Sequence, residues 1–141
     1  MDQTPVPINV QEYPHCFVCG GENASGLGLH IYRDGFDAIA SFTSNSSHQG
    51  YPERLHGGLV GLLVDEMLVY AGAPYGLLGM TAKVRYWLRK PIPIGETLAL
   101  RSRLMQQSDR GFRATVTLHL PGDVLAAEGE GMCVLRRGPA G

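Results

Sequence analysis

The sequence of 141 residues predicts an α+β domain in which a curved antiparallel sheet wraps around one long central helix. One segment has the apolar character of a buried helix. The segments around it alternate apolar and polar residues, as strands do. The connections between the strand segments are short, so consecutive strands should be antiparallel neighbours.

The predicted helix begins at Gly57 and ends near Gly72. Its Leu, Val, Met and Tyr residues cover nearly the whole circumference, which is typical of a helix that is buried on most sides. A single sheet around such a helix keeps a free face and free edges. We therefore expect the chain to form a dimer, or a tetramer of two dimers.

Two strands are predicted before the helix, over residues 27–33 and 36–42, with Asp34-Gly35 as the tight turn between them. Four strands are predicted after it, near residues 82–89, 98–104, 112–120 and 124–135. Gly129 and Gly131 interrupt the alternation of the last strand.

The length predicts one domain, which we place at residues 15–137, after an extended N-terminal arm (1–14) and before a short tail (138–141). A net charge of −1 argues against nucleic acid or an anionic membrane as the main partner. The apolar stretch 59–73 is short for a membrane span and carries two acids. Three cysteines and no signal-peptide pattern predict a cytoplasmic protein.

The segment from His56 to Glu66 carries the most chemical information. A carboxylate inside an apolar helix is costly unless it is neutralised, hydrogen-bonded or used in chemistry. The free N–H groups of a glycine-rich helix start favour negative charge. Together they indicate an acid or base beside an oxyanion site. The alternative is that Asp65 or Glu66 simply forms a salt bridge with an arginine of the sheet.

Asp65 lies seven residues after Gly58, which places it about 10 Å further along the helix axis. A base and an oxyanion donor that act on one carbonyl should each lie about 3 Å from the reacting atoms. We therefore predict that Asp65 of one chain meets the Gly57–Gly58 amides of a second chain. Glu66 is about 100° around the helix from Asp65, so it is the alternative acid rather than a second one in the same site.

The segment from His48 to Asp65, His-Gln-Gly-Tyr-Pro…His-Gly-Gly…Asp, resembles the signature of hotdog-fold acyl-CoA thioesterases of the phenylacetate-pathway and 4-hydroxybenzoyl types. In that family a His-Gly-Gly precedes the central helix, and an acid nine residues after the His is catalytic. His56 and Asp65 have this spacing. The predicted order of elements also resembles the hotdog fold, over about residues 16–135.

The resemblance implies that Asp65 is the general base or the nucleophile in thioester hydrolysis. Gly58, with Gly57 as a second donor, would hydrogen-bond the thioester oxygen, and His56 would position the thioester. His48 and Gln49 fall where relatives place polar groups near the partner chain's site. The expected reaction releases a free acid and coenzyme A, which belongs to the substrate; no metal or bound cofactor is expected.

The sequence departs from the family pattern at two places. Glu53-Arg54 stands just before the motif, where relatives often have small residues. Val69, one turn after Asp65, replaces a hydroxyl that some relatives use to hold the attacking water. Placement of the water would therefore fall to another group.

Arg85, Arg89 and Lys90 are candidate ligands for the phosphates of coenzyme A, since Arg and Lys bind phosphate readily. A solvated polar face of the sheet explains each of them equally well. The acyl group itself is not predicted by the sequence. Two rival functions stay open: a thioesterase for acyl-carrier protein, and a non-catalytic module that binds acyl-CoA.

The motif Cys16-Phe-Val-Cys19-Gly-Gly has the spacing of half a zinc site. The further candidate ligands, His15, His30 and Cys133, lack a second paired spacing. We therefore favour a tight turn with two small buried side chains, with a zinc-stabilised binding module as the remaining alternative.

Overall fold

The computed structural model describes residues 6–8 and 13–136. Of the predicted arm (1–14), only residues 6–8, 13 and 14 are described. The predicted tail, 138–141, lies outside the described residues. The elements, in chain order, are β1 (Val6–Pro7), β2 (Ile31–Asp34), β3 (Asp37–Thr43), the 3-10 helix η1 (Ser46–His48), α1 (Gly57–Tyr70), the 3-10 helix η2 (Ala73–Tyr75), β4 (Gly79–Leu88), β5 (Thr97–Gln107), β6 (Gly111–Leu120) and β7 (Val124–Leu135).

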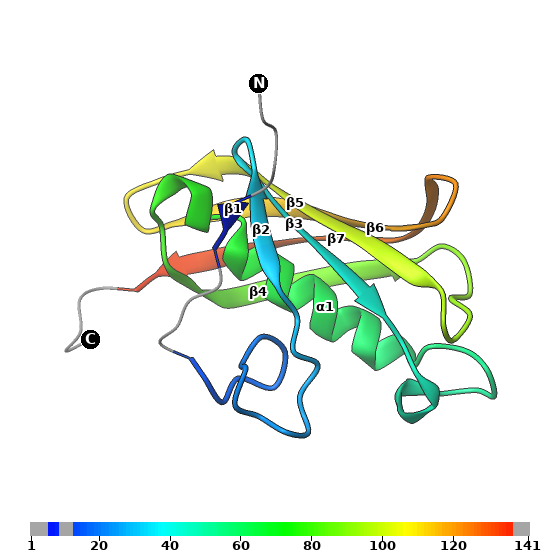
Figure 1. Ribbon diagram of the computed structural model, residues 1–141. Coiled ribbons are helices and arrows are strands. Elements are labelled where there is room, and N and C mark those ends of the chain that lie inside the picture. The colour runs from blue at the N-terminus through cyan, green and yellow to red at the C-terminus, as the bar shows by residue number, and fades with distance from the viewer. Residues whose placement is uncertain (1–5, 9–12, 137–141) are drawn as a thin grey trace.

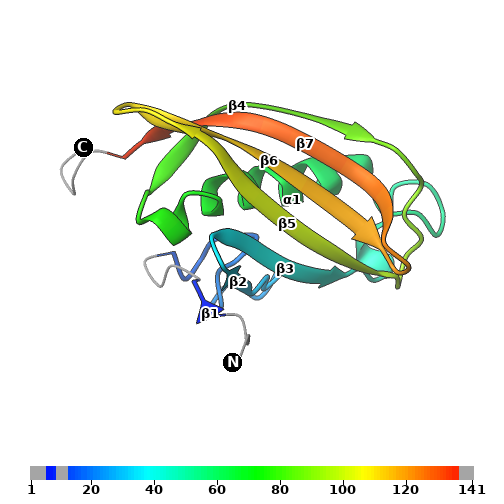
Figure 2. The same ribbon diagram turned by 90° about the horizontal axis from the view of Figure 1, so that it is seen from above.

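The strands form one sheet in the order β1-β2-β3-β5-β6-β7-β4, and every neighbouring pair is antiparallel. Figure 1 shows α1 lying across this sheet, and Figure 2 shows the sheet curving around it. The predicted fold class, a curved antiparallel sheet around one central helix, is confirmed. β4 forms one edge of the sheet.

The core lies between α1 and the inner face of the sheet. The fully buried side chains of α1 include Leu63, Val64 and Leu68. On β7 the helix packs against glycine: a Cβ on Gly129 would lie 2.5 Å from Val64 Cγ1, and one on Gly131 would lie 2.7 Å from Leu68 Cδ1. The glycines that weaken the strand pattern are therefore the positions at which the helix approaches the sheet most closely.

The first strand is shorter than predicted. The alternation predicts a strand from Leu27, but β2 begins at Ile31. Gly28 has a φ of +59°, which breaks the extended backbone before the strand. The predicted turn is present, with Gly35 at a φ of +63°. Within the predicted arm, β1 pairs with β2.

By length and composition alone, the helical segment Gly57–Tyr75 would be apolar enough to cross a membrane. Half of that segment is buried inside the fold. The central helix of a curved sheet needs the same composition, because it is enclosed on most sides.

An ionic cluster lies on the outer face of the sheet, where β2, β3 and β5 meet. Arg101 donates to Asp37 at 2.8 Å and to Asp34 at 2.7 Å, and Arg103 donates to Asp37 at 3.0 Å. The Asp37 side chain is only 13% exposed. Burial by itself would raise the pKa of Asp37, but the hydrogen bonds from Arg103 and Arg101 outweigh it and hold the pKa below its usual value.

The substitution Asp37→Asn should lower the free energy of unfolding by about 1–2 kcal/mol at pH 7. Because the folded state lowers the pKa of Asp37, the ion pairs stabilise the protein above the unfolded pKa of about 4 and lose this effect as the pH falls through the lower folded value. The difference between wild type and variant should therefore shrink between about pH 5 and pH 3. Urea unfolding at several pH values measures it. An equal difference at all pH values, or an equal loss in the exposed control Asp109→Asn, would contradict this role.

Candidate active site

One face of α1 points toward the edge strand β4. Gly57, Gly61 and Asp65 lie four residues apart and so fall within a sector of about 80° around the helix. A Cβ on Gly57 would lie 3.2 Å from Leu88 Cδ1, and one on Gly61 would lie 2.6 Å from the ring of Tyr86. Both of these contacts belong to β4, so the face that carries Asp65 lies along the edge of the sheet.

The start of the helix keeps one free amide. His56 is the N-cap, and its Nδ1 accepts a hydrogen bond from the Gly58 N–H at 2.8 Å. This bond requires Nδ1 to be unprotonated, which places the proton of a neutral His56 on Nε2. The Gly57 N–H donates to no acceptor among residues 6–8 and 13–136. In the part of the chain that the structure describes, therefore, Gly57 rather than Gly58 offers a free donor.

The loop before the helix is held by its own polar groups. His48 accepts from the Asn45 N–H through Nδ1 at 3.0 Å, and its carbonyl accepts from the His56 N–H at 2.9 Å. Gln49 accepts from the Glu53 N–H through Oε1 at 2.6 Å. The structure thus brings the predicted residues His48, Gln49 and His56 into one loop that leads into α1. Tyr86 donates from β4 to the Gly57 carbonyl at 3.2 Å and fixes the other side of the helix start.

The two neighbouring acids of α1 diverge, as the helix geometry predicts. Asp65 is half-buried and has no hydrogen bond or ion pair within the described part of the chain, so no sheet arginine neutralises it there. Glu66 lies beside Cys16, with 3.9 Å between Sγ and Oε1. Burial raises the pKa of Glu66, although a hydrogen bond with Cys19 opposes this shift.

The loop that carries Cys16 and Cys19 packs on α1. The Cys19 N–H donates to Cys16 Sγ at 3.5 Å, and Cys19 Sγ lies 3.4 Å from the hydroxyl of Tyr70. Burial raises the pKa of the Cys19 thiol to about 12. Ligand atoms of Cys16, Cys19 and Glu66 all lie within 4.8 Å of one another.

The third member of this group differs from the candidates that the sequence suggests. His15 lies instead near Glu22, with 3.8 Å between the two side chains, and Cys133 is buried on β7. Neither His15, His30 nor Cys133 belongs to the group found among the described residues. The sequence places Glu66 on a different face of the helix from Asp65. This is the signal that could have suggested a separate role for Glu66.

Two of the three predicted phosphate ligands already have acidic partners. Arg85 pairs with Glu130, and Arg89 pairs with Glu128 at 3.0 Å. Both guanidinium groups lie over the ring of Trp87, at 5.4 and 5.6 Å from its centroid.

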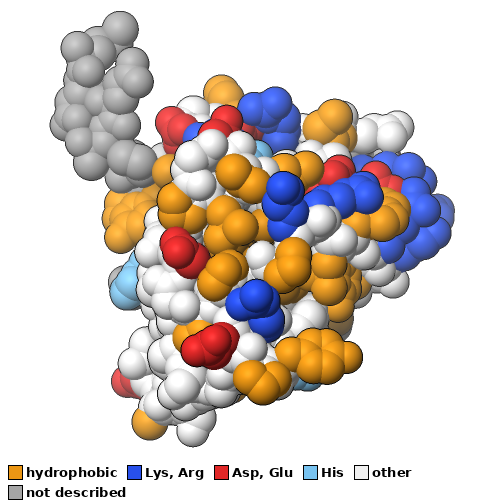
Figure 3. Space-filling model, turned by 90° about the vertical axis from the view of Figure 1, so that its right-hand side faces the viewer, with side chains coloured by type: hydrophobic (Ala, Val, Ile, Leu, Met, Phe, Trp, Pro, Cys, Tyr) orange, Lys and Arg blue, Asp and Glu red, His pale blue; other side chains and the backbone are white. Residues whose placement is uncertain are grey.

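Lys90 is exposed and forms no ion pair within the described ranges. Figure 3 looks onto the end of the molecule where α1 begins and β4 ends. On this face Lys and Arg side chains gather toward one edge, beside hydrophobic ones.

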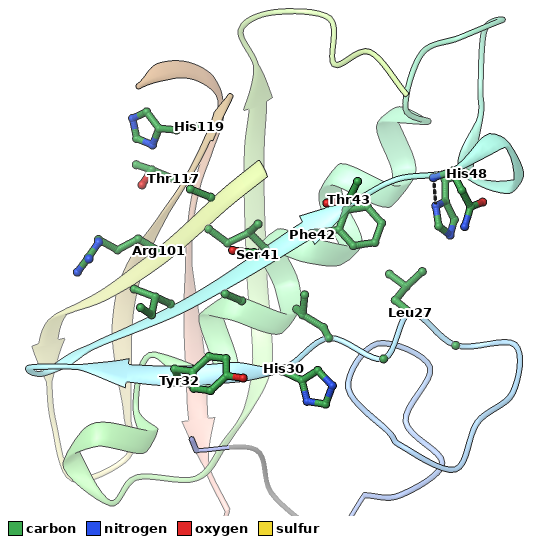
Figure 4. Close-up of a pocket in the computed structure, with 18 of the residues that line it drawn as sticks. Leu27, His30, Tyr32, Ser41, Phe42, Thr43, His48, Arg101, Thr117 and His119 are labelled. Carbon is green, nitrogen blue, oxygen red and sulfur yellow. Dashed lines mark hydrogen bonds between the residues drawn. The ribbon is translucent and has the colours of Figure 1, made fainter. Parts of the chain in front are cut away.

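A groove of about 730 Å³ lies on the outer face of the sheet over β2, β3, β5 and β6. Figure 4 shows side chains such as Tyr32, Arg101 and His119 along it, with His48 at one end. Neither Asp65 nor Gly57 lines this groove. The groove and the face of α1 described above are therefore separate features of the chain.

Solved structures share this architecture. A crystal structure of a thioesterase superfamily protein is 27% identical with a TM-score of 0.81, and the match covers 91% of this chain and 66% of that one. The Escherichia coli PaaI protein, from the phenylacetic acid degradation operon, is 20% identical with a TM-score of 0.73, covering 79% of this chain and 82% of that one. This chain thus spans just under two thirds of the length of the first structure.

A Streptococcus mutans protein solved bound to acetyl CoA is 17% identical with a TM-score of 0.68, and the match covers 71% of this chain and 81% of that one. No protein-family model and no curated protein sequence matches this chain. The fold of these structures agrees with the resemblance of the segment from His48 to Asp65 to the hotdog thioesterase signature. The chain has the hotdog fold of these thioesterase superfamily proteins.

Proposed function

We propose that this protein hydrolyses acyl-CoA thioesters to a carboxylic acid and free coenzyme A, with Asp65 as the general base or the nucleophile. The observation that carries the proposal is the unpaired carboxylate of Asp65 on the same helix face as the free Gly57 N–H. A carboxylate that forms no ion pair is available as a base or a nucleophile. The free amide at the helix start suits the negative charge that develops on a thioester oxygen.

The active site needs a second copy of the chain. Asp65 and Gly57 of one helix are about 12 Å apart along its axis, too far to act on one carbonyl. Two helices that lie antiparallel, side by side, would bring Asp65 of one chain to the Gly57 amide of the other. We propose that a twofold dimer supplies this arrangement, and that a tetramer forms from two such dimers.

The edge strand β4 supports the dimer. It is ten residues long and lies at the end of the sheet, so its outer edge is a template for pairing with a second strand. Its hydrophobic side chains are unusually open, with Met80 69% and Leu88 54% exposed. Antiparallel pairing of two β4 strands would cover them and place the two α1 helices side by side.

In this site the thioester carbonyl carbon is attacked either by water, with Asp65 accepting its proton, or by Asp65 itself, giving an anhydride that water then cleaves. The carbonyl oxygen becomes an oxyanion that the Gly57 N–H stabilises. Collapse of the tetrahedral intermediate expels the coenzyme A thiolate, which takes up a proton. His56 holds the helix start through Gly58, which keeps the Gly57 N–H oriented toward the partner chain.

Coenzyme A is the proposed thiol component because the resemblance implies it and a structural neighbour was solved bound to acetyl CoA. Arg85 and Arg89 would have to exchange their Glu partners for phosphate, whereas Lys90 is free to bind it. Their role as phosphate ligands stays a prediction. We also propose a cytoplasmic location, supported by the three free cysteines.

Release of free thiol from purified protein tests the proposal. Short, long and aromatic acyl-CoAs and the same acyl groups on acyl-carrier protein should be compared at equal concentrations. We expect turnover of one or more acyl-CoAs with a higher kcat/KM than for the carrier-protein form. Faster turnover of the carrier-protein form would instead favour the rival thioesterase. Tight binding of acyl-CoA with no thiol release from any substrate would show a non-catalytic module.

A further inference from the structure

The group formed by Cys16, Cys19 and Glu66 is not used by the proposed reaction. The two cysteines come from the loop between β1 and β2, whereas Glu66 comes from the middle of α1. Figure 1 shows this loop, in blue, lying beneath α1. The contact between Cys16 Sγ and Glu66 Oε1 joins residues that are 50 positions apart. Three metal-ligating side chains from two separate elements therefore converge at one place.

The spacing of the ligand atoms suits a zinc ion. Tetrahedral zinc with two sulfur ligands and one oxygen ligand requires about 3.8 Å between the sulfurs and about 3.6 Å between sulfur and oxygen. Here Cys16 Sγ and Glu66 Oε1 are 3.9 Å apart, and all three atoms lie within 4.8 Å of one another. Side-chain adjustments of about 1 Å would complete the geometry.

The backbone of the loop is shaped to bring the two sulfurs together. The Cys19 N–H points at Cys16 Sγ, an arrangement that stabilises a thiolate ligand. The Gly20 N–H donates to the Cys16 carbonyl at 2.9 Å and closes the turn. Only glycine fits there, because a Cβ on Gly20 would lie 2.4 Å from both Cys16 N and Pro14 O.

We propose that Cys16, Cys19 and Glu66 bind one zinc ion that fastens the loop between β1 and β2 to α1. The Cys-x-x-Cys spacing is that of the paired ligands in structural zinc sites. Thiolates prefer zinc over the hard cations magnesium and calcium. Water would occupy the remaining tetrahedral position. Because Glu66 lies about 100° around the helix from Asp65, the ion would support the helix on a different face from that of the proposed reaction.

The full-length chain, purified with a thiol reductant and stripped of metal with a chelator, tests this proposal by titration with Zn²⁺ and with Co²⁺. We expect one ion per chain. Cobalt should give a thiolate charge-transfer band and the strong visible absorption of a tetrahedral centre. The midpoint of thermal unfolding should rise when zinc is added.

The double variant Cys16→Ser/Cys19→Ser should lose the cobalt charge-transfer band and bind zinc more than about 100-fold more weakly. The variant Glu66→Gln should weaken zinc binding but keep the charge-transfer band at saturating cobalt, because both thiolates remain. Cys133→Ala is the matched control, since it removes a buried cysteine outside the group and should keep one ion per chain.

Circular dichroism of each metal-free variant shows whether it is folded. Stoichiometric binding that survives in the folded double variant, or no binding of either metal by the reduced wild type, would overturn the proposal. These readouts are independent of thioester hydrolysis, so a failed metal site and a failed catalytic assignment can be told apart.

Discussion

Asp65→Asn should lower kcat for thioester hydrolysis by about 10²–10⁴-fold, the usual contribution of a positioned general base. The amide has nearly the same shape as the carboxylate but can neither accept the proton of water nor attack the thioester. Asp65 has no hydrogen bond or ion pair in the described part of the chain, so the substitution should leave the fold intact. Steady-state kinetics and the thermal unfolding midpoint measure the two effects separately.

Binding of the substrate should persist in Asp65→Asn, and a non-hydrolysable thioether analogue of acyl-CoA can measure it by calorimetry. The comparison with Glu66→Gln identifies the acid. If Glu66→Gln loses hydrolysis and Asp65→Asn retains it, the assignment of Asp65 is wrong.

Gly57→Pro should lower kcat by about 10²–10³-fold, the usual cost of removing one oxyanion donor. Proline at this position removes the N–H that has no acceptor among the described residues. It suits the first residue of a helix, and the extended conformation of His56, with ψ of 131°, suits the residue before a proline. The helix should therefore form normally, and the loss should appear in kcat.

Gly57→Ala is the control for this variant, because it adds a side chain but keeps the N–H. Its Cβ would lie 3.2 Å from Leu88 Cδ1, the end of a flexible and exposed side chain. We expect a much smaller loss of kcat than for Gly57→Pro. Equal losses in both variants would show that space, rather than the N–H, matters at this position.

The sequence predicts the fold well because its main signals are local. The apolar helix from Gly57 and the alternation in the later strands agree with the structure to within a few residues. The error at residues 27–30 has a local cause, since Gly28 leaves the extended conformation. In the sequence, the glycines of β7 interrupt the strand pattern. In the structure they leave space for Val64 and Leu68 of α1, a packing contact between distant segments that local pattern cannot predict.

The arrangement of the candidate site residues can be predicted from the sequence only where helix geometry determines it. The divergence of Asp65 and Glu66 follows from their positions on α1. Two other features depend on side-chain and loop placement. His56 occupies the Gly58 N–H, which leaves Gly57 as the free donor. Glu66 meets Cys16 because of the path of a loop without regular structure, which no periodic pattern encodes.

In the proposed dimer, each active site joins Asp65 of one chain to the Gly57 N–H of another. Mixing Asp65→Asn chains with Gly57→Pro chains under conditions that exchange subunits tests it directly. In a mixed dimer one site would hold an intact Asp65 and an intact Gly57, and the other would hold neither.

Random mixing of equal amounts makes half of the dimers mixed, each with one working site of two. We therefore expect two nearly inactive proteins to recover about a quarter of the wild-type activity on mixing. Activity that stays at the level of the separate variants, with exchange verified by two affinity tags, would contradict a site shared between chains.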